Sequence, residues 1–124
     1  MIEKLLAVAF GGSIGAVLRF VIYELIESKH KSDFPWGTLT VNLLGSLVIG
    51  FLWGYFSRVY ISPSLRMLIF VGILGSFTTF STFAFDNFSL IRNGEFTLMT
   101  VYVLVTNLFG IALSFAGYTL SRTL

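Results

Sequence analysis

Cysteine is absent from the 124-residue sequence, and charged residues are scarce. Without cysteine the chain has no disulfide framework and no thiolate metal site. Charged residues make up 11% of the sequence, against about 25% in typical soluble domains, which excludes a soluble enzyme and a disordered chain. The net charge of +2 is too small to indicate a nucleic-acid partner. Nucleophile–base pairs, metal-ligand spacings and phosphate-binding loops are also missing, so we expect no enzyme.

Apolar residues make up 56% of the sequence, and its mean hydropathy is +0.88. A membrane-spanning helix needs about 20 mostly apolar residues, so the chain has room for four spans with short loops. The sequence therefore predicts an all-α membrane protein, a single four-helix transmembrane domain over residues 1–124, in the cell inner (plasma) membrane. We expect the spans at residues 4–27, 34–58, 65–91 and 96–121.

The basic residues are almost evenly divided between the two sides of the membrane. The near balance gives little orientation signal by the positive-inside rule, and it favours insertion both ways round. Two copies would then form an antiparallel pair, although a bias of one residue, or helper factors, is an equally open explanation. The termini and the second loop carry Lys4, Arg58, Arg66 and Arg122, the first and third loops carry Lys29, Lys31 and Arg92, and Arg19 lies within a span.

The third predicted span contains five hydroxyl residues near its middle, between Ser76 and Thr82. Two consecutive β-branched threonines, Thr78 and Thr79, follow Gly75-Ser76 and predict a break in the helix. A break frees backbone carbonyls that need a partner, and clustered carbonyls at mid-membrane suit an alkali cation. The alternative is a continuous helix that packs closely through its small residues and holds no ion.

Phenylalanine is abundant, at 14 residues, and three of these recur at positions 77, 80 and 83. A stripe of this kind is most often lipid-facing or part of a core. Because a benzene ring has a positive edge, ring edges turned into a pore would also stabilise a dehydrated anion without binding it tightly.

The other spans carry small or polar residues at intervals of four, a pattern typical of close helix packing. The second span has Asn42 on such a stripe, and the fourth span has Tyr102 and Thr106. Inside the membrane the charged residues are few: we expect Arg19 to reach a vestibule, and Asp86 to lie near an aqueous mouth. No Asp, Glu, Lys or His is expected at mid-membrane, which argues against a proton-coupled pump.

Three segments together resemble the Fluc (CrcB) family of bacterial fluoride channels over essentially the whole chain. They are Gly75-Ser76-Phe77-Thr78-Thr79-Phe80-Ser81-Thr82-Phe83, Trp36-Gly37-Thr38-Leu39-Thr40-Val41-Asn42, and Gly15-Ala16-Val17-Leu18-Arg19. The resemblance implies an antiparallel, dual-topology homodimer that passes fluoride in two pores and holds one structural, untransported Na⁺. It also implies passive fluoride efflux, which limits fluoride toxicity.

The same resemblance assigns roles to individual residues. Carbonyls of Gly75 and Thr78 would hold the sodium ion, and Ser76 replaces a glycine of the family pattern. Arg19 and Asp86 would lie in the vestibules. We expect fluoride to meet hydrogen-bond donors and ring edges along a pore formed by Asn42, Thr79, Phe80, Ser81, Phe83, Tyr102 and Thr106.

Two other readings of the sequence compete with a fluoride channel. A small multidrug-resistance-type transporter is also a four-span, dual-topology dimer, but it needs a glutamate deep in its first span, and Glu24 lies too near the end of that span. A purely structural membrane subunit would leave the polar third span unexplained.

Overall fold

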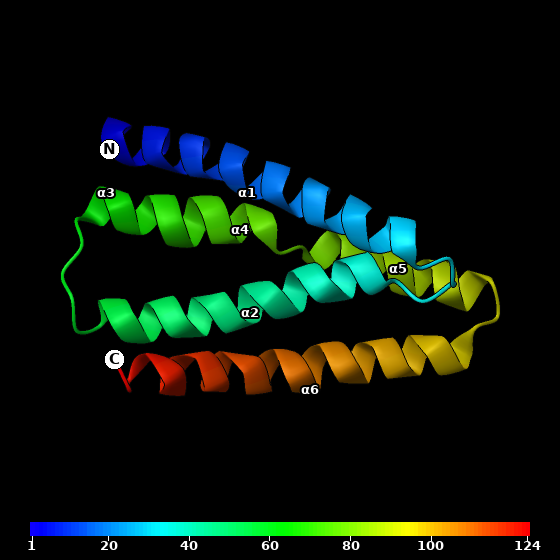
Figure 1. Ribbon diagram of the computed structural model, residues 1–124. Helices are drawn as coiled ribbons and strands as arrows, with labels where there is room; N and C mark the ends of the chain where they lie inside the picture. Colours follow the sequence, from blue (N-terminus) through cyan, green and yellow to red (C-terminus); the bar gives the residue numbers. More distant parts are fainter.

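The computed structural model describes all 124 residues as four long helices, as the hydropathy predicts (Figure 1). Both termini lie at one end of the bundle with the loop between the second and third spans, and the other two loops lie at the opposite end (Figure 1). Each span begins or ends within two residues of its expected limits. The helices are α1 (Ile2–Lys29), α2 (Trp36–Phe56), a third span made of α3 (Pro63–Arg66), η1 (Met67–Leu74), α4 (Gly75–Phe77) and α5 (Phe80–Arg92), and α6 (Phe96–Ser121).

The ends of the third span are set by local sequence. Pro63 occupies the first turn of α3, and the Ser62 hydroxyl caps it by accepting a hydrogen bond from the Leu65 N–H at 3.2 Å. At the other end, Gly94 has a φ of +74°, a left-handed conformation that glycine adopts without strain. These two turns let the span enter and leave the bundle with very short loops.

Small residues bring the helices into close contact, as the stripes at intervals of four predict. Gly11 of α1 packs against the Gly72 Cα of η1, so that a Cβ at Gly11 would meet it at 3.1 Å. Gly50 of α2 lies directly against the Ser114 carbonyl of α6, and the Ser114 hydroxyl donates to the Ser46 carbonyl at 3.0 Å. The bundle therefore depends on backbone contact between helices, the usual mode of packing in membranes.

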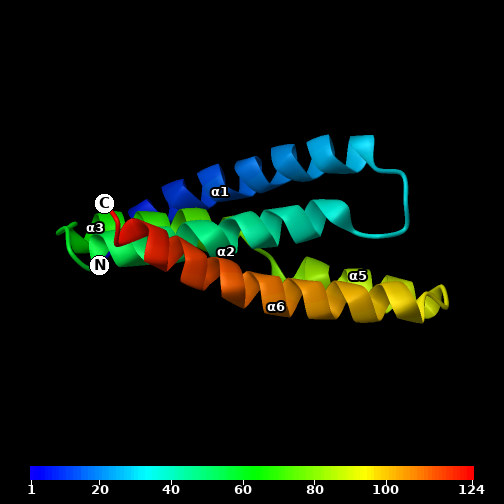
Figure 2. The ribbon, with the colours of Figure 1, turned by 60° about the horizontal axis from the view of Figure 1, so that its bottom comes forward.

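Extended backbone at Thr78 and Thr79 interrupts the third span midway, as the sequence predicts. Thr78 has φ −82° and ψ 158°, and Thr79 has φ −149° and ψ 123°. The interruption lets the span change neighbours, because η1 and α4 pack against α1 whereas α5 packs against α6. Figure 2 shows α5 beside α6 and apart from α1. The first half of the same span, η1, is π-helical, which the sequence pattern does not indicate.

Candidate functional site

The amide of Asn42 holds the break in the third span. Its Nδ2 donates to the Thr79 carbonyl at 3.1 Å, and its Oδ1 accepts from the Thr79 N–H at 2.8 Å. The Thr79 hydroxyl accepts a bond from the Thr82 N–H at 3.2 Å and so caps the start of α5. One side chain of α2 thus satisfies both backbone groups of a residue that has left the helix.

These bonds leave two backbone carbonyls without their usual helical donors. In an unbroken helix the Thr79 N–H would bond to the Gly75 carbonyl, and the Thr82 N–H would bond to the Thr78 carbonyl. Both N–H groups are used elsewhere, by Asn42 and by the Thr79 hydroxyl. The break therefore releases carbonyls at Gly75 and Thr78, the two residues to which the family resemblance assigns a cation site.

A groove of about 370 Å³ runs along the break between α2, the third span and α6. The hydroxyl oxygen of Thr106 is buried there without a hydrogen-bond partner. Asn42 keeps one N–H beyond its bonds to Thr79. Seven residues with predicted pore or cation roles line this groove together: Asn42, Gly75, Thr78, Thr79, Phe80, Phe83 and Thr106.

Two phenylalanine rings meet at this groove. Phe80 is 78% exposed in the single chain, while Phe83 is half-buried, and their centroids are 5.9 Å apart with the ring planes inclined at 46°. Phe83 also packs against the Tyr102 ring at 5.0 Å, which fixes its position. The two rings therefore differ in packing, because Phe83 contacts the Tyr102 ring whereas most of the Phe80 ring is exposed.

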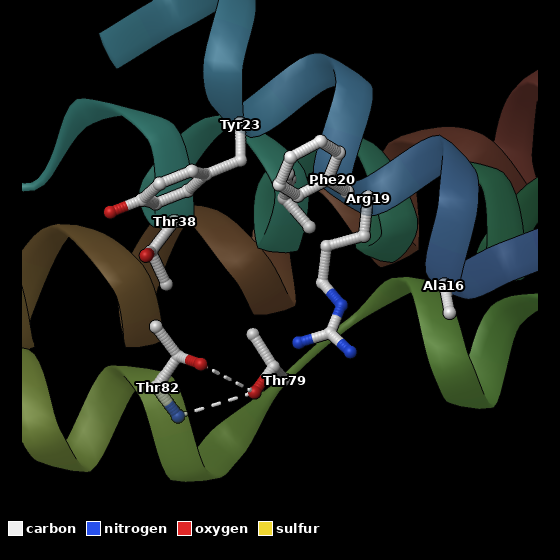
Figure 3. A pocket seen from close by; sticks show the side chains of 8 residues that line it. Ala16, Arg19, Phe20, Tyr23, Thr38, Thr79 and Thr82 are labelled. Atoms are coloured by element: carbon white, nitrogen blue, oxygen red, sulfur yellow. Dashed lines mark hydrogen bonds between the residues drawn. The ribbon is translucent and has the colours of Figure 1, made fainter.

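Arg19 lies in a second cavity, of about 280 Å³, on the other side of the break. Its side chain extends from α1 toward Thr79 and Thr82, with Tyr23 and Thr38 also lining the cavity (Figure 3). The Nε of Arg19 is buried without a hydrogen-bond partner. Because Thr79 lines both this cavity and the groove, the break separates a positively charged cavity from a ring-lined groove.

Three of the predicted site residues lie outside both spaces. Tyr102 is fully buried, and its hydroxyl donates to Asp86 Oδ2 at 2.9 Å. Asp86 lines a separate cavity of about 100 Å³, so the two predicted vestibule residues, Arg19 and Asp86, do not share a cavity. Ser81 lies on the exposed face of α5, with its hydroxyl 3.4 Å from that of Thr79.

The structure adds residues that sequence reasoning did not select. Thr38 is 1% exposed, and its hydroxyl has no hydrogen-bond partner beside the Arg19 cavity. Glu27 Oε1 accepts from the Gly37 N–H at 2.9 Å and so caps the first turn of α2. Thr38 lies in one of the segments that carry the family resemblance, but nothing in its local pattern distinguishes it from the neighbouring Thr40.

At the end of the bundle opposite the termini, two carboxyl groups lie close together outside the membrane spans. A side-chain hydrogen bond to Asp33 is the main cause that raises the pKa of Glu95. A raised carboxyl pKa means that the folded state binds more protons than the unfolded state, so this pair favours folding at low pH and loses that effect as the pH rises.

The fold and the groove together define a small polytopic membrane protein with a polar site beside a helix break at mid-membrane, an architecture found in proteins that move ions. The model of the family described as CrcB-like protein, Camphor Resistance (CrcB), matches residues 6–118. The chain therefore belongs to the CrcB family.

Relatives of this chain carry one shared name. "Fluoride-specific ion channel FluC" of Aquifex aeolicus is 43% identical over 119 residues, which cover 95% of this chain and 96% of that protein. The protein of the same name from Parabacteroides distasonis is 36% identical over 121 residues, covering 98% and 94%. That of Leptospira interrogans is 37% identical over 116 residues, covering 93% and 91%.

Proposed function

We propose that this protein is a fluoride-selective ion channel, not an enzyme, and that it lets fluoride leave the cell passively, which lowers cytoplasmic fluoride and its toxicity. One observation carries the proposal: the mid-membrane groove gathers two phenylalanine rings and the unpartnered hydroxyl of Thr106. The names of the relatives point to the same ion. A multidrug-type transporter finds no support, since Glu24 is exposed near the end of α1 and lines no part of the groove.

The chemistry of the groove suits a small, strongly hydrated anion that only accepts hydrogen bonds. The Thr106 hydroxyl and the remaining N–H of Asn42 would replace water as donors. The edges of Phe80 and Phe83 would add a weak attraction, which allows the ion to leave again. We propose that Tyr102 supports the path indirectly, by packing against Phe83, and that Arg19 raises the local anion concentration from its own cavity.

We further propose that the working unit is an antiparallel homodimer. Gly75, Phe80 and Ser81 are exposed at mid-membrane in the single chain, beside backbone carbonyls that the break has released. Lipid offers such polar groups no hydrogen bonds, so protein must cover them. A second copy in the opposite orientation would bring two breaks face to face, and the near balance of basic residues supports that arrangement.

A structural Na⁺ between the two breaks is the third part of the proposal. The residues fit such an ion, because Gly75 and Thr78 have lost their helical donors and carbonyl oxygens suit an alkali cation. Gly75 also leaves open space at its Cα, where a Cβ would approach only the Phe70 carbonyl, at 3.7 Å. When bound, the ion would supply positive charge to carbonyl oxygens that otherwise face one another.

The test is purified protein in liposomes loaded with potassium fluoride, with release measured by a fluoride electrode after addition of a potassium ionophore. Fast fluoride release is expected, with no release of chloride from matched liposomes. Equal release of both ions, or of neither, would overturn the proposed function. A separate experiment prepares the protein in sodium-free buffer. Loss of the dimer there supports the structural sodium ion. An unchanged dimer contradicts the sodium ion and leaves the channel proposal intact.

A further inference from the structure

The loop between α2 and α3 forms a basic cavity at the end of the bundle that holds the termini. The cavity has a volume of about 460 Å³, and two arginines, Arg58 and Arg66, are among the residues that line it. It lies where the second membrane span ends and the third begins, between Phe56 and Pro63. That position corresponds to the depth of lipid headgroups.

Both arginines are held in place without being neutralised. Arg58 donates from Nε to the Gly54 carbonyl at 3.4 Å and from Nη2 to the Ser121 carbonyl. Arg66 donates from Nη2 to the Phe56 carbonyl at 3.3 Å. Carbonyls orient a guanidinium but do not cancel its charge, and each group keeps further N–H donors.

The surroundings of the two arginines contain almost no negative charge. Glu3, at the start of α1, is the only acidic residue at this end of the molecule. The other five lie near the end of α1, in α5, or in the two loops of the opposite end. Tyr60 and Ile61 also line the cavity, and their backbone N–H groups donate to no other backbone group. Two guanidinium groups and two such amides on one small cavity make a site for an oxyanion.

Aromatic residues place this cavity at the membrane surface. Tyr60 is 83% exposed and Trp53 is 55% exposed, and exposed tyrosine and tryptophan are typical of the headgroup layer. The Arg66 guanidinium lies over the Trp53 and Phe70 rings, 5.6 Å from each centroid. The oxyanion that is abundant at this depth is the phosphate of a phospholipid.

We propose that this cavity binds the phosphate of an anionic phospholipid. An anionic headgroup is favoured over a zwitterionic one because no carboxylate lines the cavity to pair with a choline or ethanolamine cation. This binding site is independent of the ion path, since none of its residues lines the groove or the Arg19 cavity.

Trp53 provides the measurement. The chain has two tryptophans, so Trp36→Phe leaves Trp53, beside Arg66, as the only one. This variant is reconstituted with brominated phosphatidylglycerol or brominated phosphatidylcholine over the same series of mole fractions, and bromine quenching of Trp53 is recorded at each. We expect the anionic lipid to occupy the site at about fivefold lower mole fraction for each arginine that contributes.

Adding Arg58→Gln and Arg66→Gln to the Trp36→Phe protein should abolish its preference for phosphatidylglycerol over phosphatidylcholine. The matched control adds Lys4→Gln and Arg122→Gln, which remove the same charge from the same end without touching the cavity. Should the arginine pair disturb folding, the exposed Arg58→Gln alone should still lower the preference about fivefold.

Three results would overturn the proposal. Equal quenching by the two lipids in the Trp36→Phe protein would show that there is no headgroup preference. An equal loss of preference in the control pair would show general charge attraction only. Complete loss of the preference for phosphatidylglycerol in buffer that holds inorganic phosphate at its cellular concentration would assign the cavity to free phosphate, because the lipid would then not keep the cavity against the soluble anion.

Discussion

At the residue scale, Asn42 combines two tasks that a simple donor role would not require. Its oxygen and one of its N–H groups are bound to the backbone of Thr79, and the second N–H remains free. The side chain therefore fixes the break as well as offering a donor to the groove. A substitution at this position changes the geometry of the break and the chemistry of the groove together.

Asn42→Asp keeps one of the two hydrogen bonds to Thr79 and removes the other. A carboxylate still accepts from the Thr79 N–H, but it cannot donate to the Thr79 carbonyl, which it repels instead. Losing a buried hydrogen bond and adding a negative charge beside the path should lower fluoride flux in liposomes by at least about tenfold. Asn107→Asp is the matched control, because Asn107 lines the same groove but donates only to Val103 of its own helix. An equal loss of flux in both variants would assign the effect to charge alone.

The exposed ring of Phe80 gives a second test at this scale. Phe80→Ile keeps an apolar side chain of similar bulk and removes the ring edge, so fluoride flux should fall roughly three- to tenfold while the protein stays folded. Phe85→Ile is the control, since Phe85 lies on the same helix, is 64% exposed and does not line the groove. Normal flux through the Phe80 variant, measured with the fluoride electrode, would remove the ring-edge argument at this position.

At the scale of the helices, α2 and α6 depend on glycine for their contact. A Cβ at Gly50 would collide with the Ser114 carbonyl, and one at Gly117 would collide with the Leu47 carbonyl. Backbone atoms of a neighbouring helix cannot turn aside as a flexible side chain can. The separation of these two helices, and with it the width of the groove, is therefore set by residues that do not themselves line the groove.

Gly50→Ala should destabilise the folded protein by about 1–3 kcal/mol, because the added methyl forces the two helices apart. Gly110→Ala is the matched control, since its Cβ would meet only the Ser46 Oγ, at an ordinary 3.6 Å. Unfolding of each variant in detergent, followed by circular dichroism against increasing denaturant, measures the difference. Equal stability of the two variants would mean that the helices adjust freely at Gly50.

Local patterns predicted the helices and the break, but not what the break touches. Hydropathy fixes the spans because each is long and apolar, and the paired threonines predict the interruption because their branched side chains disfavour a helix beside Gly75-Ser76. The bonds from Asn42 to Thr79 join positions 37 residues apart, and no pattern within one helix encodes them. The unpartnered Thr38 hydroxyl was missed for the same reason, since its environment is built by other helices.

At the scale of the whole molecule, charge is divided unevenly along the bundle. The end with the termini carries Lys4, Arg58, Arg66 and Arg122 against one acidic residue, Glu3, whereas the opposite end carries three basic and five acidic residues. The sign of the net charge thus differs between the two ends of the bundle, although the numbers of basic residues at the two ends are nearly equal. Two antiparallel copies would place one end of each kind at both membrane surfaces, which cancels the asymmetry.

The orientation of the chain in the membrane can be measured directly with one added thiol, because the sequence contains no cysteine. Thr123→Cys places a single thiol at the end with the termini, and an impermeant thiol reagent applied to intact cells should label about half of the molecules. Adding Lys29→Gln and Lys31→Gln leaves one basic residue against four, so the terminal end should stay inside and labelling should nearly vanish. Complete or absent labelling before the lysines are changed would contradict insertion in both orientations.

The two-lysine variant should also lose fluoride flux, because antiparallel partners become scarce while each chain remains intact. Lys4→Gln, Arg58→Gln and Arg122→Gln together reverse the bias, leaving one basic residue against three. Each biased variant alone should pass little fluoride, and producing both in the same cells should restore flux, since opposite orientations then meet. Full flux through either variant alone would mean that a single orientation suffices, and the face left open at Gly75, Phe80 and Ser81 would then need another cover.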